Sequence, residues 1–164
     1  MENRLITMQG MLLDEIDAYA EQIPQRDASR EYEKVHAIGC GKIGYLLALQ
    51  RGVDPEMAAA ACSVHDYGRI VTGRQEGHAK AGYEPVKEFL AGTGLYSEEE
   101  IETIAVAVRN HSSKSEIGTP MEEIVKDADV LDFHQCGYEM PRAEQQKRLD
   151  AMLAAGWDGG NKGE

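Results

Sequence analysis

Signals that start α-helices recur along this 164-residue chain, and they constrain its fold more than any other feature. Ser97 is followed three residues later by Glu100, and Thr119 is followed by Pro120 and by Glu122. Both patterns are typical of a capping box, in which the hydroxyl and the glutamate satisfy free backbone N–H groups at a helix start. Apolar residues recur at helical spacing after each box, and no stretch alternates with the period of two typical of a strand. The chain is therefore predicted to be all-α.

Proline, glycine and further capping residues divide the chain into about six to seven helices. The first covers about residues 3–23 and ends before Pro24, and the second starts at Asp27 or Ser29 and runs to Gly52. Glycines in residues 67–77 predict a loop, which is long enough to act as a lid. The other expected helices cover residues 54–66, 78–91, 97–110, 119 onward and about 141–155.

One domain is expected over residues 1–164, with its core at about 27–135 and a frayed tail after the last helix. The 17 basic and 29 acidic residues give a net charge of −12, which argues against nucleic-acid partners and against docking on an anionic membrane. A small phosphorylated substrate stays compatible with this charge. Three widely spaced cysteines, no signal-peptide pattern and no long apolar run make the cytoplasm the expected location.

Four of the five histidines are expected on or beside four different helices, and a fifth helix brings three aspartates. Imidazoles and carboxylates supplied by separate helices are how a helical bundle forms a metal site. Each residue alone is weak evidence, because a single histidine on a helix is more often a surface or core residue. The residues in question are His36, His65, His78, His111, Asp127, Asp129 and Asp132.

Their order resembles the HD superfamily of metal-dependent phosphohydrolases, whose pattern is a histidine, a His-Asp pair and a distant aspartate. Here these are His36, His65-Asp66 and an aspartate of Asp127-Ala128-Asp129-Val130-Leu131-Asp132. The family's closing motif, Ala-Asp-x-Leu, indicates Asp129. The resemblance covers about 100 residues and implies an HD-domain helical bundle.

The resemblance also implies a site for divalent Mn, Fe, Co, Ni or Zn, all of which accept imidazole and carboxylate ligands. One ion is expected, with room for a second that Asp66 would bridge and that His78 and His111 would ligate. The ligands of the first ion are His36, His65, Asp66 and Asp129.

The same resemblance assigns roles in catalysis to Asp66, Arg69 and His111. Arg69, His78 and His111 would bind the substrate phosphate, although Arg69 could equally be an exposed loop arginine. Asp132 would hold a metal ligand in place through a hydrogen bond or contact a substrate hydroxyl, and a surface aspartate is an equal alternative. Lys114 is expected at the surface, and Tyr138 is expected to be a single aromatic with no platform around it.

The function expected from this family is hydrolysis of a phosphate ester or anhydride of a small molecule, with a nucleotide as the substrate class. Two alternatives stay open. One is a non-catalytic module that binds a metal or nucleotide and regulates a partner, and the other is a di-iron oxidative enzyme on the same scaffold. The sequence leaves the oligomeric state open.

Overall fold

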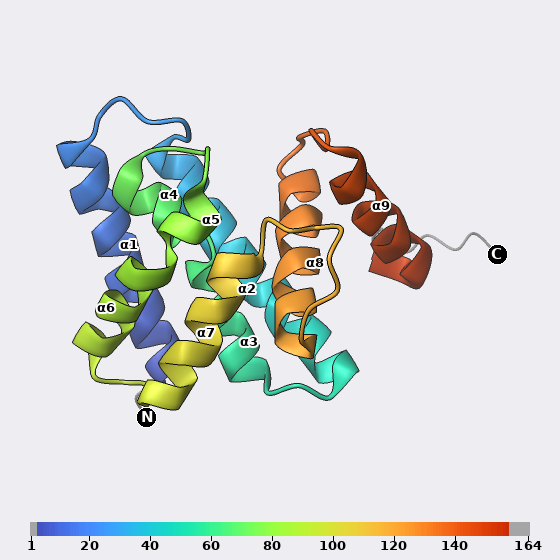
Figure 1. The fold of residues 1–164 in the computed structure, drawn as a ribbon, viewed down its shortest axis with the longest axis horizontal. Helices are drawn as coiled ribbons and strands as arrows, with labels where there is room; N and C mark the ends of the chain where they lie inside the picture. The colour runs from blue at the N-terminus through green and yellow to red at the C-terminus, as the bar shows by residue number, and fades with distance from the viewer. Residues whose placement is uncertain (1–2, 158–164) are drawn as a thin grey trace.

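The structure, a computed structural model, describes residues 3–157, and that part of the chain is helical without any strand. Seven of its α-helices have ten residues or more, as the sequence analysis predicted, and two short ones, α4 and α5, lie between them (Figure 1). The all-α prediction is therefore confirmed. The elements are α1 (Arg4–Gln22), α2 (Arg30–Arg51), α3 (Pro55–Val64), α4 (Tyr67–Thr72), α5 (His78–Ala81), α6 (Tyr83–Thr93), α7 (Glu98–Asn110), α8 (Pro120–Gln135), α9 (Ala143–Met152) and a last π-helical turn (Leu153–Trp157).

The predicted helix starts agree with the observed caps. Ser97 and Thr119 both form complete capping boxes, with Glu100 and Glu122 at the third helical position. Ser29, rather than Asp27, caps α2, so the second of the two starts considered for that helix is the observed one. Local hydrogen bonding at a helix start thus fixes where α2, α7 and α8 begin.

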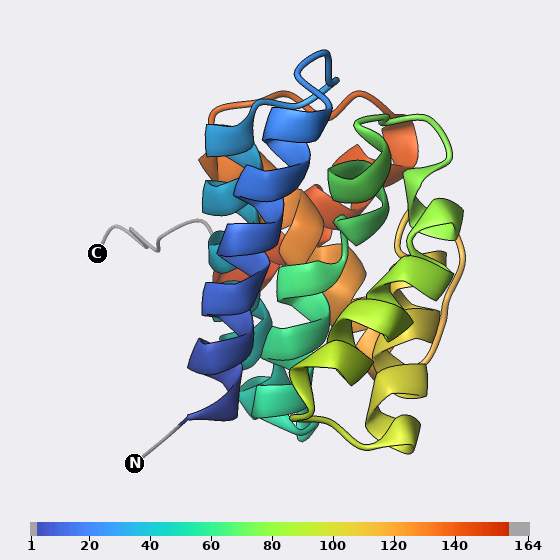
Figure 2. The same ribbon diagram turned by 90° about the vertical axis from the view of Figure 1, so that its left-hand side faces the viewer.

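Helix α2 lies at the centre and packs most extensively against α3 and α8. Figure 1 shows α1 and α6 on one side and α8 and α9 on the other, and Figure 2 shows α1 along the outside of the bundle. Glycines let α2 and α3 approach closely. A Cβ at Gly41 would lie 2.4 Å from Ser63 Oγ, and one at Gly44 would lie 2.4 Å from Cys62 Sγ. This close packing sets the N-terminal half of α2 beside the C-terminal end of α3, where two of the candidate ligands lie.

Residues 67–77 depart from the predicted loop, because Tyr67–Thr72 form α4 and Gly73 ends that helix with a φ of 71°. The prediction was wrong because Gly68 was taken as a loop signal. Gly68 instead provides space, since a Cβ there would lie 1.9 Å from His78 O and 2.6 Å from Gly82 N. The helix expected over 78–91 is likewise two helices, α5 and α6, which meet at Gly82.

At the C-terminal end, α9 starts two residues after the predicted position, and a last turn with a kink at Gly156, where φ is 99°, extends to residue 157. The expected frayed tail falls largely on residues 158–164, which lie outside the described residues. Over residues 3–157, no helix combines the length and the apolar character needed to cross a membrane.

Candidate metal centre

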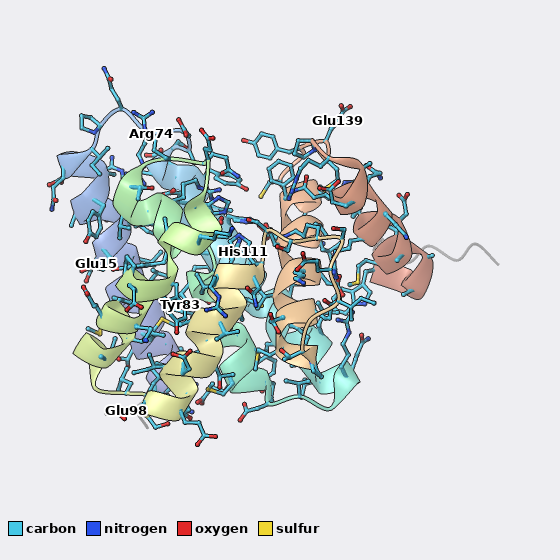
Figure 3. All side chains as sticks on the ribbon, in the orientation of Figure 1. Glu15, Arg74, Tyr83, Glu98, His111 and Glu139 are labelled. Carbon is cyan, nitrogen blue, oxygen red and sulfur yellow. The ribbon has the colours of Figure 1, made fainter. Side chains whose placement is uncertain are left out.

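Five helices bring the candidate ligands together at one pocket of about 510 Å³, which all of them line except the fully buried His65. His36 lies within α2, His65 ends α3, and His78 is the first residue of α5. His111 ends α7, opposite Glu98 at the start of that helix (Figure 3), and Asp129 lies within α8. The four histidines and Asp66 are each at most 8% exposed. The structure thus brings together residues that the sequence places up to 93 positions apart.

All four histidines use Nδ1 in the same way, as a donor to a fixed oxygen. Because a carbonyl or carboxylate oxygen can only accept, Nδ1 carries the hydrogen, and Nε2 of the neutral ring carries a lone pair. Three of these oxygens are backbone carbonyls three residues earlier, so the local backbone orients the rings, at helix ends for His65 and His111 and in the turn before α5 for His78. The four contacts are His36 to Asp132 Oδ2 at 2.6 Å, His65 to Cys62 O at 2.7 Å, His78 to Gln75 O at 2.6 Å and His111 to Val108 O at 2.7 Å.

The four Nε2 atoms gather around the two oxygens of Asp66. Oδ2 lies 3.5 Å from His36 Nε2 and 3.2 Å from His65 Nε2. Oδ1 lies 3.0 Å from His78 Nε2 and 3.4 Å from His111 Nε2. Asp66 therefore separates the histidines into two pairs, one on each carboxylate oxygen.

Asp129 completes the first pair from α8. Its Oδ1 lies 3.1 Å from His36 Nε2 and 3.4 Å from His65 Nε2. Cys40 adds a thiol nearby, with Sγ 3.6 Å from each nitrogen of the His36 ring. Sequence reasoning did not select Cys40, although its position one helical turn after His36 was a usable signal.

This donor set fits a cation. His65 Nε2 is buried and has no hydrogen-bond partner among residues 3–157. The Nε2 atoms of His78 and His111 face each other at 3.0 Å, so two lone pairs would meet unless a proton or a metal ion lies nearby. Imidazole nitrogens and carboxylate oxygens together suit Mn²⁺, Fe²⁺, Co²⁺, Ni²⁺ or Zn²⁺. The residues present therefore fit the divalent ion that the sequence analysis expects.

Two buried cationic side chains, Lys114 and Arg69, form ion pairs with the carboxylates of Asp129 and Asp66. Lys114 Nζ donates to Asp129 Oδ2 at 2.6 Å and to His111 O at 2.6 Å. It is 3% exposed, so the expectation of a surface lysine was wrong. The spacing of Lys114, three residues after His111, was the sequence feature that could have indicated its place in the site. Lys114 leaves Asp129 Oδ1 as the oxygen that faces the histidines.

Arg69 is also buried and is not the exposed loop arginine of the alternative interpretation. Its guanidinium donates to Glu33 Oε1 at 3.2 Å, Gln75 Oε1 at 2.7 Å and Asp66 Oδ2 at 2.5 Å. A guanidinium has five N–H donors, so two remain after these three bonds. Arg69 is also one of the residues that line the pocket.

The charges shift the titration of the buried groups. Burial alone would raise the pKa of Asp66, but Arg69 and His65 outweigh it and hold that pKa well below its usual range. Lys114 and His65 do the same to the pKa of Asp129. Burial lowers the pKa of His111 to about 4, with His65 and Lys114 acting in the same direction. The carboxylates thus stay ionised and His111 stays neutral at pH 7, which are the forms that bind metal.

Asp132 lies behind His36, where its Oδ2 accepts from Nδ1, and it is 5% exposed. This position agrees with the supporting role expected for it rather than with a surface aspartate. Asp127 points elsewhere and forms ion pairs with Arg51 at 2.8 Å and with Arg148 at 2.9 Å. Of these two aspartates, Asp129 therefore lies beside the histidines and Asp127 does not.

Aromatic side chains are the other feature of the pocket that sequence reasoning missed. Tyr138 was expected to have no platform around it, but its ring stacks on Phe133 with centroids 5.0 Å apart. Tyr32 contacts both rings edge-on. The prediction failed because these residues meet only after α2 and α8 pack together.

Comparisons with known proteins agree with this geometry. The model of the HD domain family matches residues 35–133. A crystal structure described as a predicted HD superfamily hydrolase from an uncultured Thermotogales bacterium is similar in fold, with a TM-score of 0.58 and 18% sequence identity. That similarity covers 88% of this chain and 87% of the other chain. A search of curated proteins found no match. Since the family model spans more than half of the sequence and includes His36, His65, Asp66 and Asp129, this chain belongs to the HD domain family.

Proposed function

We propose that this protein is a metal-dependent phosphohydrolase that cleaves a phosphate ester or anhydride of a small molecule, with nucleotides as the substrate class. The observation that carries the proposal is the convergence of four imidazole Nε2 atoms on Asp66 beside a pocket large enough for a small ligand. Membership of the HD domain family supports the hydrolase class, as does the description of the similar structure as a predicted HD superfamily hydrolase.

His36, His65 and Asp129, together with Asp66, would hold the first ion. His78 and His111, also with Asp66, would hold a second one. The sequence analysis expected one ion, but the two separate oxygens of Asp66 and the facing Nε2 atoms of His78 and His111 favour a pair. The number of ions stays a prediction, and metal analysis of the loaded protein measures it.

A bound divalent ion supplies an acidified water molecule and polarises a phosphoryl oxygen. The chain's own groups prepare the site for that chemistry. Asp132 fixes the ring orientation of His36, and Lys114 holds Asp129 so that one oxygen faces the histidines. The two remaining N–H donors of Arg69 can bind phosphate oxygens, which the planar guanidinium suits. No serine or cysteine nucleophile is required for attack by water.

The test is phosphate release from a panel of nucleotides and sugar phosphates with added Mn²⁺, Co²⁺, Ni²⁺ or Mg²⁺. Turnover should disappear with a chelator and in Asp66→Ala. A matched pair gives a sharper control: Asp129→Asn should abolish turnover, whereas Asp127→Asn should retain it. Both residues are aspartates of α8, but Asp127 forms its ion pairs with Arg51 and Arg148 away from the histidines.

The two alternative functions predict different results from the same protein. A regulatory binding module would hold stoichiometric metal without releasing phosphate from any substrate. A di-iron oxidative enzyme would purify with two irons and a visible absorbance, and it would also release no phosphate. Because one fold supports several chemistries, metal content and turnover must be measured on the same preparation.

A further inference from the structure

Three aromatic rings line the pocket close to the metal ligands. Tyr32 precedes His36 by four residues on α2, and Phe133 follows Asp129 by four residues on α8. Residues four apart lie on the same face of a helix, so each ring is stacked one turn from a ligand. Tyr138 follows in the loop between α8 and α9. We call Tyr32, Phe133 and Tyr138 the aromatic wall.

Ring contacts connect the ligand His36 to Tyr32, and Tyr32 to Tyr138 and Phe133. The Tyr32 ring stacks on the His36 ring with centroids 5.1 Å apart and planes 15° apart. Tyr138 stacks on Phe133 at 5.0 Å and 26°, and Tyr32 meets Tyr138 edge-on at 5.6 Å. These are favourable aromatic geometries, which hold the rings in fixed positions relative to one another.

All three rings line the same pocket as His36, His78 and His111, and Met140 extends the apolar surface. Tyr138 is 49% exposed although it packs against two other aromatics. A large apolar surface of this kind inside a pocket is typical of a ligand contact rather than of a core. Phe133 stacks on Tyr138, and about half of the Tyr138 side chain stays exposed, so part of its ring is open to a planar group.

The pocket lining therefore combines charged groups with an aromatic surface that lies directly beside them. Arg69 and Lys114 contact the ligands, where an anionic phosphate would be bound. A phosphate ester bound at the ligands would place its organic group against these rings, within a pocket of about 510 Å³.

We propose that the aromatic wall selects phosphate esters whose organic group carries a flat aromatic ring, which stacks on Tyr138 while the phosphate lies among the histidines. This inference rests on the proposed function for the position of the phosphate. A nucleobase and a simple aryl group share the required chemistry, and the two arms of the experiment distinguish them. Tyr138 acts as a specificity-determining residue because it supplies the face against which the ring stacks.

The first arm measures binding without turnover. Phenylphosphonate and cyclohexylphosphonate have similar size and a C–P bond that the proposed reaction does not cleave. Calorimetry with the metal-loaded protein should show tighter binding of phenylphosphonate by at least about 5-fold, the lower end of the effect of stacking on an aromatic side chain. Tyr138→Leu should remove this preference, and Tyr138→Phe should keep it because the ring remains.

A matched control tests whether the effect belongs to the pocket. Tyr45 has a similar exposure of 40% but lies on α2 outside the pocket that holds the histidines. Tyr45→Leu should leave the phenyl preference unchanged. Far-UV circular dichroism of each variant checks that the helices are intact.

The second arm compares hydrolysis of a nucleoside 5′-monophosphate with that of ribose 5-phosphate, which have the same type of leaving oxygen. A kcat/KM preference for the nucleotide that Tyr138→Leu removes would identify the ring as a nucleobase. A preference in the phosphonate arm alone would identify a simple aryl group. Equal binding of the two phosphonates by the native protein, or an unchanged preference in Tyr138→Leu, would overturn the inference. Tyr138-dependent phosphonate binding without any turnover would refute the proposed function and leave the wall's selectivity standing.

Discussion

Replacing Gly68 by alanine tests how the fold positions the second pair of histidines. Gly68 does not have a positive φ, so its role is space rather than an unusual backbone conformation. It lies in α4 and faces the backbone of α5, and Gly82 at the end of α5 faces it in return. A side chain on Gly68 would therefore separate the two helices.

The size of the effect follows from the distances. The new Cβ would lie 1.9 Å from His78 O and 2.6 Å from Gly82 N, whereas ordinary contacts begin at 3.4 Å. Both obstacles are backbone atoms, which cannot rotate away as the end of a side chain can. Overpacking typically costs about 1–3 kcal/mol, and we expect the upper end, about 3 kcal/mol of unfolding free energy. For a chain of this length, that corresponds to a fall in Tm of roughly 6–12 °C.

The same displacement has a functional consequence, because His78 is the first residue of α5. Its Nε2 lies 3.0 Å from Asp66 Oδ1, and separation of α4 from α5 would lengthen that distance. Gly68→Ala should therefore lose metal at the position of His78 and His111 before it loses metal at the position of His36 and His65. Metal content per chain, measured after loading and desalting, reports this difference.

Urea denaturation followed by circular dichroism measures the stability change. Gly10→Ala is the matched control, because Gly10 lies inside α1 with nothing within 4 Å of the added Cβ. That variant should gain about 0.5–1 kcal/mol, since alanine favours a helix more than glycine does. A Gly68→Ala variant within about 0.5 kcal/mol of the native protein, the range of neutral surface changes, would refute the steric argument.

Three further predictions concern the ligands. Asp132→Asn should weaken metal binding roughly 10- to 100-fold in a chelator competition, because His36 loses the carboxylate that orients its ring; unchanged affinity would contradict that role. Lys114→Met should cost the metal-free protein about 3 kcal/mol in urea denaturation, because the buried charge of Asp129 loses its partner, and less when metal is bound; an equal loss in both forms would argue against a cation site. Burial lowers the pKa of His65, but Asp66 and Asp129 outweigh it and raise that pKa to about 9. Below that pH a metal ion must displace a proton from His65, so the apparent affinity for the metal should rise with pH up to about 9 and then level off. A metal affinity that stays constant from pH 6 to 9 would contradict the assignment of His65 as a ligand.

Features encoded within a few residues could be predicted from the sequence. The starts of α7 and α8 depend on hydrogen bonds between Ser97 and Glu100 and between Thr119 and Glu122, all within one turn. The order of histidines and aspartates also carried enough information to indicate the family. The choice of Asp129 over Asp127 rested on a motif, and the ion pairs of Asp127 supply its physical reason.

Features that depend on segments far apart could not be predicted in this way. Gly68 resembles a helix breaker until Gly82, fourteen residues later, is seen packed against it. Lys114 resembles a surface lysine until α8 brings Asp129 to its ammonium group. The aromatic wall did have a local signal, the four-residue spacing of Tyr32 from His36 and of Phe133 from Asp129, but its meaning depends on the packing of α2 against α8.

The most direct test of the central claim is anomalous-difference density from crystals of the native protein grown with Zn²⁺. The account predicts a peak that lies roughly 2.0–2.2 Å from His36 Nε2, His65 Nε2 and an oxygen of Asp129, the usual distances of zinc to nitrogen and carboxylate ligands. A second peak beside His78 and His111 would establish the pair of ions. Fully occupied zinc found only at surface carboxylates, with no density among these histidines, would contradict the assignment of the metal centre.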